Sequence, residues 1–492
     1  MAELLIRSGP RCIRVQAEPG TPLSHVLMQT DIAVQQPCGG RGVCGKCAVM
    51  LDGAFSAPNA HECRAGVRLA CQAVIEGDGE VILPRQAEMT QIESGSALVF
   101  APLNPLPGLM GAAADIGTTT LALRLFDLRS GQCIGISTML NPQTSVAADV
   151  IGRMDAAMKG QLTRQQQMIV SALETMLAHA ASQCGADPAQ VGSLCITGNT
   201  TMLYLLCGRD PVSLSRAPFR ADHLFGEPVS LMGREAYLPP CLHAFVGADT
   251  TCAILASGMC RSDETALLCD VGTNGEIALW RNGRLYVAST AAGPAFEGAG
   301  ISCGCGSIPG AIDRVDIVNG QLHSRTIGGG KAAGLCGSGL ISLIAGLLDL
   351  EMLDETGTLE EDEITLAPGV SLTQADVRAV QLAKAAIAAG IGCLMEKAGC
   401  RAEDIRTLYL AGGFGSHLSI PHAVRIGLIP PQLQGRVKVI GNAALDGAAL
   451  LLTDQSRTGE AQRLAGSALH VDLGGSAAFS SRYVEEMFFP EI

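Results

Sequence analysis

The sequence of 492 residues is poor in aromatic residues, which make up 3% of it and include one tryptophan. Proteins that bind single-stranded nucleic acid stack the bases on aromatic side chains, and duplex binding depends on clustered lysine and arginine. Here 34 basic residues stand against 47 acidic ones, which gives a formal net charge of -13. We therefore expect no nucleic acid among the partners of this chain.

Long hydrophobic runs are also missing. No stretch reaches the roughly 18 uninterrupted apolar residues that a membrane-spanning helix needs, and we recognise no secretory signal pattern. The 19 cysteines are an odd number in a chain too long to need a disulfide scaffold. These features predict a cytoplasmic protein without membrane contact, whose cysteines are reduced thiols.

Three familiar signatures are absent from the sequence. There is no P-loop, no glycine fingerprint of dinucleotide-binding folds after a strand, and no Gly-x-Ser-x-Gly elbow of hydrolases. A phosphate ligand would have to be bound by another kind of loop.

A glycine-rich cysteine loop is present, with the sequence Cys38-Gly-Gly-Arg-Gly-Val-Cys44-Gly-Lys-Cys47. Glycines let the backbone come close enough to point N–H groups at the sulfurs of an iron-sulfur cluster. The spacing is one residue longer than the plant-type C-x4-C-x2-C. Zinc sites pair two short Cys or His elements, and no second element follows, so the loop favours a cluster over zinc. For the fourth ligand we favour Cys71, in an apolar strand-like run, over Cys63.

Composition and patterning divide the chain into four parts. Residues 1–86 predict a small mixed fold, with strands near 4–6, 12–15, 69–74 and 81–83 and a helix that begins at Thr21–Pro22. Residues 87–110 turn polar and then proline-rich, which predicts a semi-extended linker. The segments 111–265 and 266–492 predict two related α/β lobes, because each opens with the same kind of turn.

That turn follows an apolar strand-like run and reads Asp115-Ile-Gly-Thr-Thr in one lobe and Asp270-Val-Gly-Thr-Asn in the other. It places a carboxylate beside several backbone N–H and hydroxyl donors. Two such turns facing each other would bind a polyphosphate, while Asp115 and Asp270 hold water or Mg²⁺. A third glycine turn follows a later strand-like run and is expected to lie along an adenosine. Its residues are Gly412, Gly413, Phe414 and Gly415.

Two features outside this scheme are open. Lys384 lies on the apolar stripe of a helix predicted over 373–397, with Thr373 as its cap and Gly399 just past its end. It either reaches a phosphate or, as we favour, extends its amine to solvent. A Cys-x-Cys in a glycine-rich turn invites a metal or redox interpretation, although we favour a structural role. The cysteines concerned are Cys303, Cys305 and Cys336.

Taken together, these motifs resemble the reductive activators of corrinoid proteins, which join a ferredoxin-like domain to an ATPase of the acetate kinase, sugar kinase, Hsp70 and actin type. The linker looks shorter than the family's linker domain, and Cys305 is an additional cysteine. Seven further segments carry the resemblance. They are Asn141-Pro-Gln with Ala148-Asp-Val, Thr197-Gly-Asn-Thr-Thr, Val246-Gly-Ala-Asp, Ala292-Gly-Pro-Ala-Phe-Glu-Gly, Cys336-Gly-Ser-Gly-Leu and Asn442-Ala-Ala-Leu.

The resemblance implies an α/β multidomain protein. Residues 1–86 would form an N-terminal β-grasp ferredoxin-like domain that carries a 2Fe-2S cluster, and residues 87–110 a short linker. Residues 111–265 and 266–492 would form the two lobes of an actin-like ATPase of the ASKHA, ribonuclease H-like type. The implied cluster ligands are Cys38, Cys44, Cys47 and Cys71.

The resemblance also implies ATP between the lobes, with Mg²⁺, and Asp115 and Asp270 as the catalytic residues. The implied nucleotide-binding residues are Gly117, Thr118, Thr119, Gly272, Thr273, Asn274, Gly412, Gly413, Phe414 and Gly415. The expected activity is ATP-dependent transfer of one electron from the cluster to cobalt(II), giving cobalt(I), on the corrinoid protein of a methyltransferase system. A low-potential ferredoxin or flavoprotein would supply the electron, and the molecule would be a homodimer.

Three alternatives remain at this stage. Activators of 2-hydroxyacyl-CoA dehydratases or aryl-CoA reductases have similar ATPase lobes, but they carry a 4Fe-4S cluster between subunits and lack the N-terminal ferredoxin domain. A small-molecule kinase would need no cluster. A nucleotide-binding module with a redox-sensing cluster would not transfer electrons catalytically.

Overall fold

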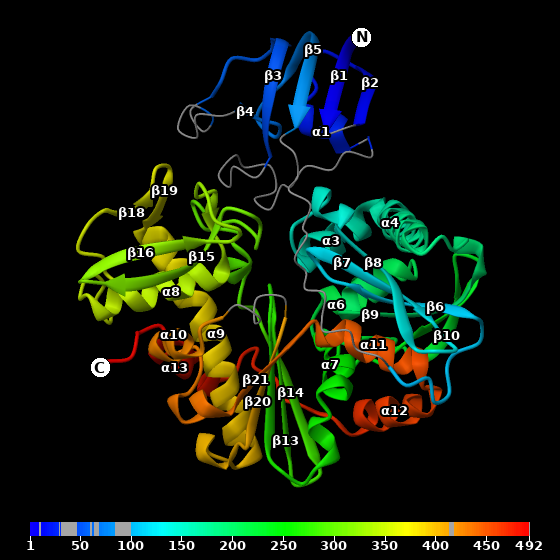
Figure 1. Ribbon diagram of the computed structural model, residues 1–492, viewed down its shortest axis with the longest axis vertical. Coiled ribbons are helices and arrows are strands. Elements are labelled where there is room, and N and C mark those ends of the chain that lie inside the picture. The colour runs from blue at the N-terminus through cyan, green and yellow to red at the C-terminus, as the bar shows by residue number, and fades with distance from the viewer. Residues whose placement is uncertain are drawn as a thin grey trace.

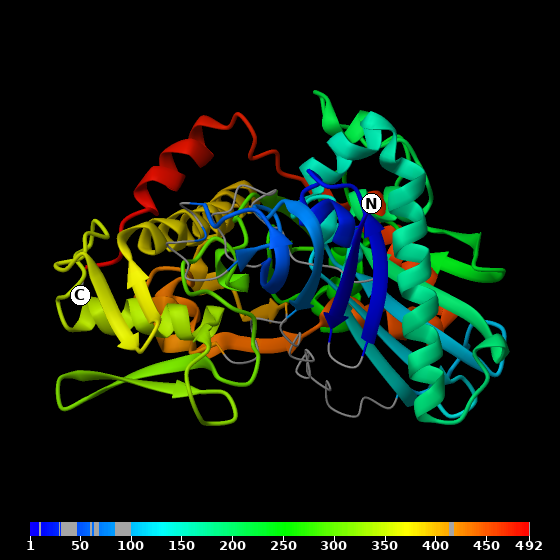
Figure 2. The ribbon, with the colours of Figure 1, turned by 90° about the horizontal axis from the view of Figure 1, so that it is seen from above.

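The computed structural model describes residues 1–8, 11–28, 30, 47–59, 62, 68–83, 100–412 and 418–491. Three sheets of five or six strands organise these residues, with smaller sheets of three and two strands beside them. The five-stranded sheet lies above two larger lobes that face each other (Figure 1). Seen from above, it covers the junction between the lobes (Figure 2). The predicted α/β multidomain architecture is confirmed.

The N-terminal sheet has the order β2-β1-β5-β3-β4, with β1 parallel to β5 and the other pairs antiparallel. Alternate residues of β1, among them Leu4 and Ile6, point into a core where both are fully buried. The elements are β1 (Ala2–Ser8), β2 (Arg11–Ala17), α1 (Leu23–Met28), β3 (Ala48–Phe55), β4 (Arg68–Leu69) and β5 (Ile75–Leu83).

Two sequence predictions in this domain need correction. The helix begins at Leu23, just after Thr21–Pro22. The strand predicted over 69–74 is wrong: β4 ends at Leu69, and a turn carries the chain into β5. The N–H groups of Gln72 and Ala73 both donate to the Leu69 carbonyl, so this apolar run is buried as a turn.

The first lobe is built on a sheet of order β10-β11-β9-β6-β7-β8. Strands β6, β7 and β8 form an antiparallel meander, and β9 lies parallel to β6. The elements are β6 (Met110–Ile116), β7 (Thr120–Asp127), β8 (Gln132–Leu140), η1 (Pro142–Ser145), α3 (Val150–Ala156), η2 (Ala157–Gln161), α4 (Leu162–Gln183), η3 (Pro188–Gln190), β9 (Val191–Gly198), α5 (Thr200–Leu206), α6 (Val212–Ser215), β10 (Glu227–Leu231), β11 (Arg234–Leu238), α7 (Ala248–Ser257) and η4 (Met259–Arg261).

The second lobe repeats this plan in the order β21-β20-β12-β13-β14-β22. Here β12, β13 and β14 form the meander, and β20 lies parallel to β12. Its elements are β12 (Ala266–Val271), β13 (Gly275–Arg281), β14 (Arg284–Thr290), η5 (Ala295–Glu297), β15 (Ala311–Val318), β16 (Gln321–Thr326), β17 (Gly334–Leu335), α8 (Gly337–Asp349), β18 (Glu363–Ala367), β19 (Val370–Thr373), α9 (Gln374–Ala398), η6 (Ala402–Asp404), β20 (Thr407–Ala411), α10 (Ile420–Arg425), η8 (Pro431–Arg436), β21 (Val437–Gly441), α11 (Ala443–Thr453), η9 (Gln455–Arg457), α12 (Thr458–Ser467), β22 (Leu469–His470) and α13 (Ala477–Glu485).

Helices α7 and α11 connect the lobes. Helix α11 follows β21 of the second sheet but packs against β6 and β9 of the first. A side chain at Gly447 would place its Cβ 2.0 Å from the Cys252 carbonyl oxygen of α7, so only glycine permits this crossing. The end of the predicted linker is fixed to the same helix, since the Leu106 N–H donates to the Leu452 carbonyl. The crossing positions the start of α11 between the lobes, where its N-cap Asn442 donates to Asp115.

Helix α9 has the predicted ends, with a Thr373–Asp376 capping box and Gly399 at φ 62°. The prediction for Lys384 is wrong. Its side chain is fully buried, Nζ donates to the Phe488 carbonyl at 2.5 Å, and Nζ lies 5.5 Å from the Phe489 ring centroid. Burial lowers the pKa of Lys384 to about 8. The lysine reaches neither solvent nor a phosphate, and instead anchors the C-terminal tail to α9.

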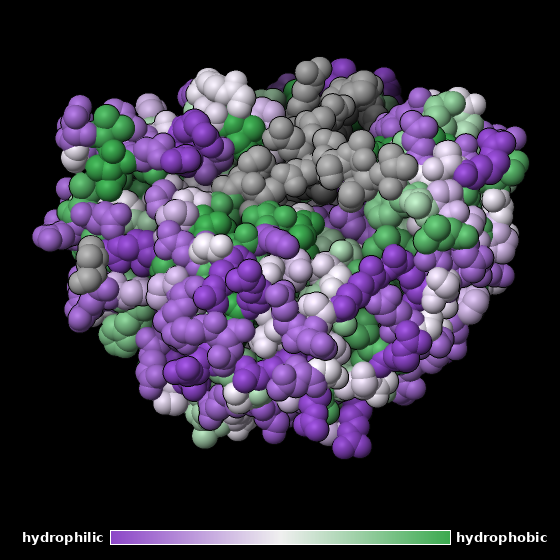
Figure 3. All heavy atoms as spheres, turned by 60° about the horizontal axis from the view of Figure 1, so that its bottom comes forward, coloured by the Kyte–Doolittle hydropathy of each residue, from purple (hydrophilic) through white to green (hydrophobic). Residues whose placement is uncertain are grey.

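Among the described helices, α9 alone is long and apolar enough to span a membrane, and 72% of its apolar window is buried inside the protein. That burial is typical of a core helix. On the face drawn in Figure 3, apolar residues form small patches between hydrophilic ones, as on most globular proteins.

A pair of stacked histidines joins the loop before α7 to β22. The ring centroids of His243 and His470 are 3.6 Å apart and their planes differ by 7°. Burial lowers the pKa of both rings, to about 4 for His470, where His243 adds to the shift and Asp472 opposes it. Since the folded pKa lies below the unfolded one, the stability linked to this ring is present above the unfolded pKa and decreases as pH falls toward the folded value.

We therefore expect acidification from about pH 7 to about pH 5 to lower the melting temperature, and His470→Phe to reduce that drop, because phenylalanine keeps the ring but cannot be protonated. Thermal unfolding at a series of pH values measures the effect. Equal acid sensitivity of both proteins would contradict this role for His470.

Candidate functional site

The two predicted turns join the first and second strands of each lobe. Asp115 lies near the end of β6, and the chain turns over 117–119 into β7. Asp270 lies near the end of β12, and the chain turns over 272–274 into β13. The sequence prediction of two equivalent strand-turn-strand units is confirmed, whereas the roles of their residues stay a prediction.

Five carboxyl groups interact around these turns: Asp115, Asp249, Asp270, Glu276 and Glu297. The side chains of all five residues are partly buried and partly exposed. Burial is the largest cause that raises their pKa values, to about 8 for Asp115, about 7 for Asp270 and about 6 for Asp249. Mutual charge repulsion adds to the shift for Asp115, Asp270 and Glu276. A cation placed here would therefore be strongly favoured.

Carboxylate oxygens of this kind are suitable ligands for Mg²⁺. Within the described residues, no three His, Cys, Asp or Glu side chains are spaced to hold a metal ion directly. The arrangement suits a cation that keeps several of its waters and is completed by phosphate oxygens, which is the usual behaviour of Mg²⁺.

Asn141 and Arg153 bind the carbonyl groups of the first turn. Asn141 Nδ2 donates to the Gly117 carbonyl at 2.8 Å, and its backbone N–H donates to the Thr119 carbonyl at 2.8 Å. Arg153, which is fully buried in α3, donates from Nη2 to the Thr118 carbonyl at 2.6 Å. The carbonyl groups of Gly117, Thr118 and Thr119 thus all accept hydrogen bonds from Asn141 or Arg153. This arrangement suits a turn that presents its N–H donors to an anion. Burial lowers the pKa of Arg153 to about 9, so its charge is poorly solvated.

Glu297 connects the two turns. Thr119 Oγ1 of the first turn donates to Glu297 Oε2 at 3.0 Å, and Thr273 Oγ1 of the second lies 3.1 Å from both carboxylate oxygens. Both threonines were predicted to donate to phosphate. In the structure their hydroxyl groups are bound to a carboxylate.

Two asparagines extend the hydrogen-bond network of the first turn. Asn199 Nδ2 donates to Thr118 Oγ1 at 3.1 Å. Asn442, the N-cap of α11, donates to Asp115 Oδ2 at 3.2 Å and accepts from the Leu445 N–H at 2.9 Å. The helix crossing described above is therefore linked directly to the first acidic turn.

The third predicted element is described only at its start. Gly412 has φ 95°, and a Cβ there would lie 2.8 Å from Asp270 Oδ1. The close approach to the second acidic turn requires glycine at this position. Gly413, Phe414 and Gly415 lie outside the described residues.

Several residues of this site were given no role by the sequence. Asn141, Asp249 and Glu297 stood in motifs that supported the family resemblance, and that was the available signal. Arg153 had no signal of its own. Each acts through contacts with residues far away in the chain.

The Cys-x-Cys element shows separate contacts for its sulfurs. Cys336 Sγ donates to the Ile312 carbonyl at 3.3 Å, and Cys303 Sγ to the Gly369 carbonyl at 3.6 Å. The backbone N–H of Cys305 donates to the Leu335 carbonyl. These contacts fit the structural role favoured from the sequence.

Of the predicted cluster ligands, the structure describes Cys47 and Cys71, whereas Cys38, Cys44 and the reserve Cys63 lie outside the described residues. Cys47 is buried just before β3, and its carbonyl accepts the Ala70 N–H at 2.9 Å. This bond extends the β3–β4 pairing and brings the turn with Cys71 beside Cys47. Two cysteines brought to one edge of the sheet by backbone pairing fit a shared cluster.

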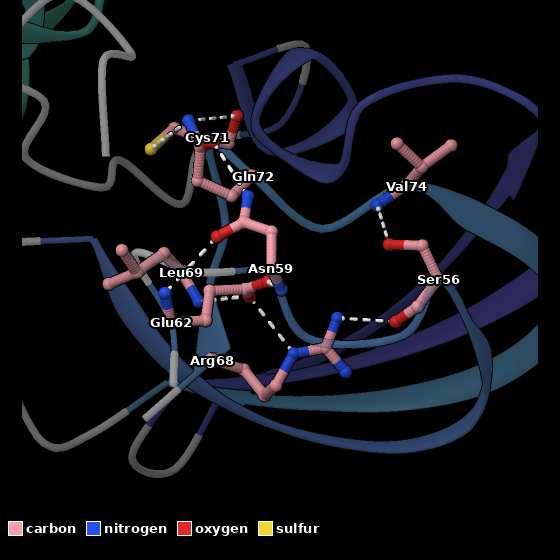
Figure 4. A network of polar contacts seen from close by, with 8 residues as sticks. All are labelled: Ser56, Asn59, Glu62, Arg68, Leu69, Cys71, Gln72 and Val74. Carbon is pink, nitrogen blue, oxygen red and sulfur yellow. Dashed lines mark hydrogen bonds and ion pairs between the residues drawn. The ribbon is translucent and has the colours of Figure 1, made fainter. Parts of the chain in front are cut away.

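A polar network supports the Cys71 turn (Figure 4). The Glu62 carboxylate accepts Arg68 Nε and the Leu69 N–H, each at 2.9 Å. Asn59 Nδ2 donates to Gln72 Oε1 at 2.9 Å, which directs Gln72 Nε2 toward Cys71, where it lies 3.3 Å from the carbonyl oxygen and 3.5 Å from Sγ. Hydrogen bonds to ligand sulfurs are among the interactions that tune iron-sulfur clusters.

Three models of known protein families match successive parts of the chain. The model for the "2Fe-2S iron-sulfur cluster binding domain" matches residues 8–76, the "RACo middle region" matches 110–262, and the "C-terminal domain of RACo the ASKHA domain" matches 264–492.

The corrinoid activation enzyme RamQ of Eubacterium limosum is 33% identical over 440 residues, which cover 81% of this chain and 74% of the relative. The Co(II) methylated amine-specific corrinoid protein reductase of Methanosarcina barkeri is 27% identical over 426 residues, 77% of each chain. A solved structure titled as a reductive activator for a corrinoid, iron-sulfur protein superposes with a TM-score of 0.72 at 26% identity, covering 100% of this chain and 98% of the other. On these matches and the repeated acidic turns, the chain belongs to the family of reductive activators of corrinoid proteins.

Proposed function

We propose that this protein performs ATP-dependent reductive activation of a corrinoid protein, in which one electron passes from a 2Fe-2S cluster to cobalt(II) and gives cobalt(I). The observation that carries the proposal is the presence, in one chain, of a ferredoxin-type domain and two facing acidic turns. The relatives named for corrinoid activation and corrinoid reduction support it. The ferredoxin-type domain also separates this chain from the dehydratase-activator and kinase alternatives.

The bound cluster would supply a one-electron carrier at the low potential typical of plant-type centres, near roughly -400 mV. Cys38, Cys44, Cys47 and Cys71 would hold it. The fit rests on Cys47 and Cys71, which the sheet brings to one edge.

In the cleft, Asp115 and Asp270 would position Mg²⁺ and the attacking water. The phosphate oxygens would accept hydrogen bonds from Thr118, Thr119, Thr273 and Asn274. Gly117 and Gly272 would let the backbone of the two turns come close to the phosphates. The segment Gly412–Gly415 would flank the adenosine. The raised pKa values of Asp115 and Asp270 support this proposal, because a cation would relieve the repulsion between them. The first turn also supports it, since its three carbonyl groups are bound by Asn141 and Arg153.

ATP is needed because a cobalt(II) acceptor can lie below the donor in potential. A shortfall of about 200 mV opposes transfer of one electron by roughly 5 kcal/mol. We propose that nucleotide binding and hydrolysis move the lobes about the α7–α11 crossing, change the grip on the corrinoid protein and so offset this barrier. The partners would be a corrinoid protein of a methyltransferase system and a low-potential ferredoxin or flavoprotein, and the activator would be a cytoplasmic homodimer.

The test is anaerobic absorption spectroscopy of cobalt in a corrinoid protein mixed with the reduced activator. With ATP and Mg²⁺ we expect catalytic formation of cobalt(I), and with ADP or no nucleotide at most a small stoichiometric amount. Equal yield and turnover with and without ATP would refute the coupling. No cobalt reduction under any condition would favour a redox-sensing module.

A further inference from the structure

Glu297 occupies the space between the two turns that are proposed to bind phosphate. It ends the short helix η5 of the second lobe. Its carboxylate accepts the hydroxyl protons of Thr273, from its own lobe, and Thr119, from the first lobe, at 3.0–3.1 Å. This one side chain therefore bridges the cleft.

The two threonines cannot serve Glu297 and a phosphate at the same time. A hydroxyl group has one proton to donate, and both a carboxylate and an ionised phosphate only accept. While Thr119 and Thr273 donate to Glu297, their protons are committed to it. A phosphate that accepts hydrogen bonds from these two hydroxyl groups must displace the carboxylate from both.

Charge acts in the same direction. Burial and the charge of Asp249 raise the pKa of the Asp270 carboxyl, and Glu297 lies close enough to raise it further. A polyphosphate would bring more negative charge into this group. Removal of one carboxylate from the space between the turns would weaken that repulsion.

We propose that Glu297 is a phosphate-competing positioning residue: it holds Thr119 and Thr273 together across the nucleotide-free cleft and yields both hydroxyl groups to the nucleotide phosphates on binding. This inference rests on the proposed nucleotide function of the cleft. Glu297 thereby sets nucleotide affinity and ties closure of the two lobes to occupancy of the phosphate site.

The experiment uses the full chain with its cluster, under anaerobic conditions, and measures the Kd of ADP and ATP by calorimetry, with and without Mg²⁺, for wild type and Glu297→Gln. Glutamine has the same shape and still offers a carbonyl acceptor, but it forms weaker bonds than a carboxylate and carries no charge. We expect the Kd to fall about tenfold in the variant. Glu297→Asp keeps the charge but is too short to bind both hydroxyl groups, and should show a smaller gain.

The matched control is Glu363→Gln, at an exposed position of β18, whose Kd should equal that of wild type. Hydrogen exchange gives a second measurement. In the absence of nucleotide, the turns at 117–119 and 272–274 should exchange faster in Glu297→Gln than in wild type, and saturating nucleotide should remove the difference.

An unchanged Kd in Glu297→Gln would overturn the proposal. Binding that weakens only when Mg²⁺ is present would also overturn it, and would assign the carboxylate to the cation. If neither protein bound nucleotide, the proposed function of the cleft would fail together with this exchange, whereas tight binding by wild type with no change in the variants would refute the exchange alone.

Discussion

Replacement of Asp270 by alanine is expected to lower ATPase turnover by about 10²- to 10³-fold and to leave the visible spectrum of the iron-sulfur domain unchanged. Asp270 lies on the second acidic turn beside Gly412, and burial, together with the charges of Asp249 and Glu297, raises its pKa to about 7. Its carboxylate is one of two that would position Mg²⁺ and the attacking water. Cys47 and Cys71, the predicted cluster ligands that the structure describes, lie beside the N-terminal sheet and not in the second lobe, so the ATPase activity should be lost without loss of the cluster.

The same substitution has a second, opposite effect on stability. Burial and the neighbouring carboxyl groups disfavour the charged form of Asp270, and Asp270 in turn helps to raise the pKa of Asp115 to about 8. Removing one member of this group relieves repulsion in the nucleotide-free protein. We therefore expect the melting temperature of nucleotide-free Asp270→Ala to equal or exceed that of wild type, as functional sites often reduce stability.

Phosphate release, the visible spectrum and thermal unfolding, measured on one preparation, check this prediction. Asp263→Ala, at an exposed position just before β12, is the matched control and should behave as wild type in all three. Retained ATPase activity in Asp270→Ala would exclude Asp270 from the reaction. Joint loss of ATPase activity, colour and melting temperature would indicate misfolding.

Local features of the fold could be predicted because the chain encodes them locally. The Asp-x-Gly-Thr segments produce strand-turn-strand units, since an apolar run ends in a turn that glycine permits. The repetition of that pattern predicted two related lobes, and both sheets show the same order of meander and parallel strand. Thr373 and Gly399 end α9 as predicted, because caps depend on neighbouring backbone groups.

Contacts between distant segments could not be predicted in this way. Lys384 was expected to reach solvent, but the C-terminal tail returns and places the Phe488 carbonyl against its amine. Arg153 gave no signal because its role depends on the Thr118 carbonyl, in a turn of another element. Glu297 was visible only as part of a motif. A sequence shows which residues are present, but their hydrogen-bond partners are decided by tertiary packing.

The prediction of the fourth cluster ligand depends both on local sequence and on contacts between distant segments. Cys71 was favoured as the fourth ligand on the ground that it lies in a strand, and that ground is wrong, because it lies in a turn after β4. The structure supplies a better argument. The Ala70 N–H binds the Cys47 carbonyl, which places the turn beside a second predicted ligand, and Gln72 directs an N–H at the Cys71 sulfur.

We therefore expect Cys71→Ala to lose most of its iron and sulfide and the EPR signal of the reduced protein, with ATPase activity retained. Cys63→Ala should keep a full complement of two irons, as expected for a 2Fe-2S centre. Cys44→Ser, within the cysteine loop, should resemble Cys71→Ala. Iron and sulfide content per chain, together with anaerobic EPR spectra, checks the prediction.

The reverse result would be informative about the network around the turn. If Cys63→Ala lost the iron and Cys71→Ala kept it, the ligand would follow directly after Glu62, whose carboxylate binds the Leu69 N–H and Arg68. The Gln72 amide would then lie beside a thiol that is not a cluster ligand and would have no influence on the cluster potential. Iron loss in both variants would mean that the turn must be intact for cluster assembly. Gln72→Ala would then show whether Cys71 is a ligand. If it is, this variant should keep the iron and shift the reduction potential, because the N–H donor to the ligand sulfur is gone.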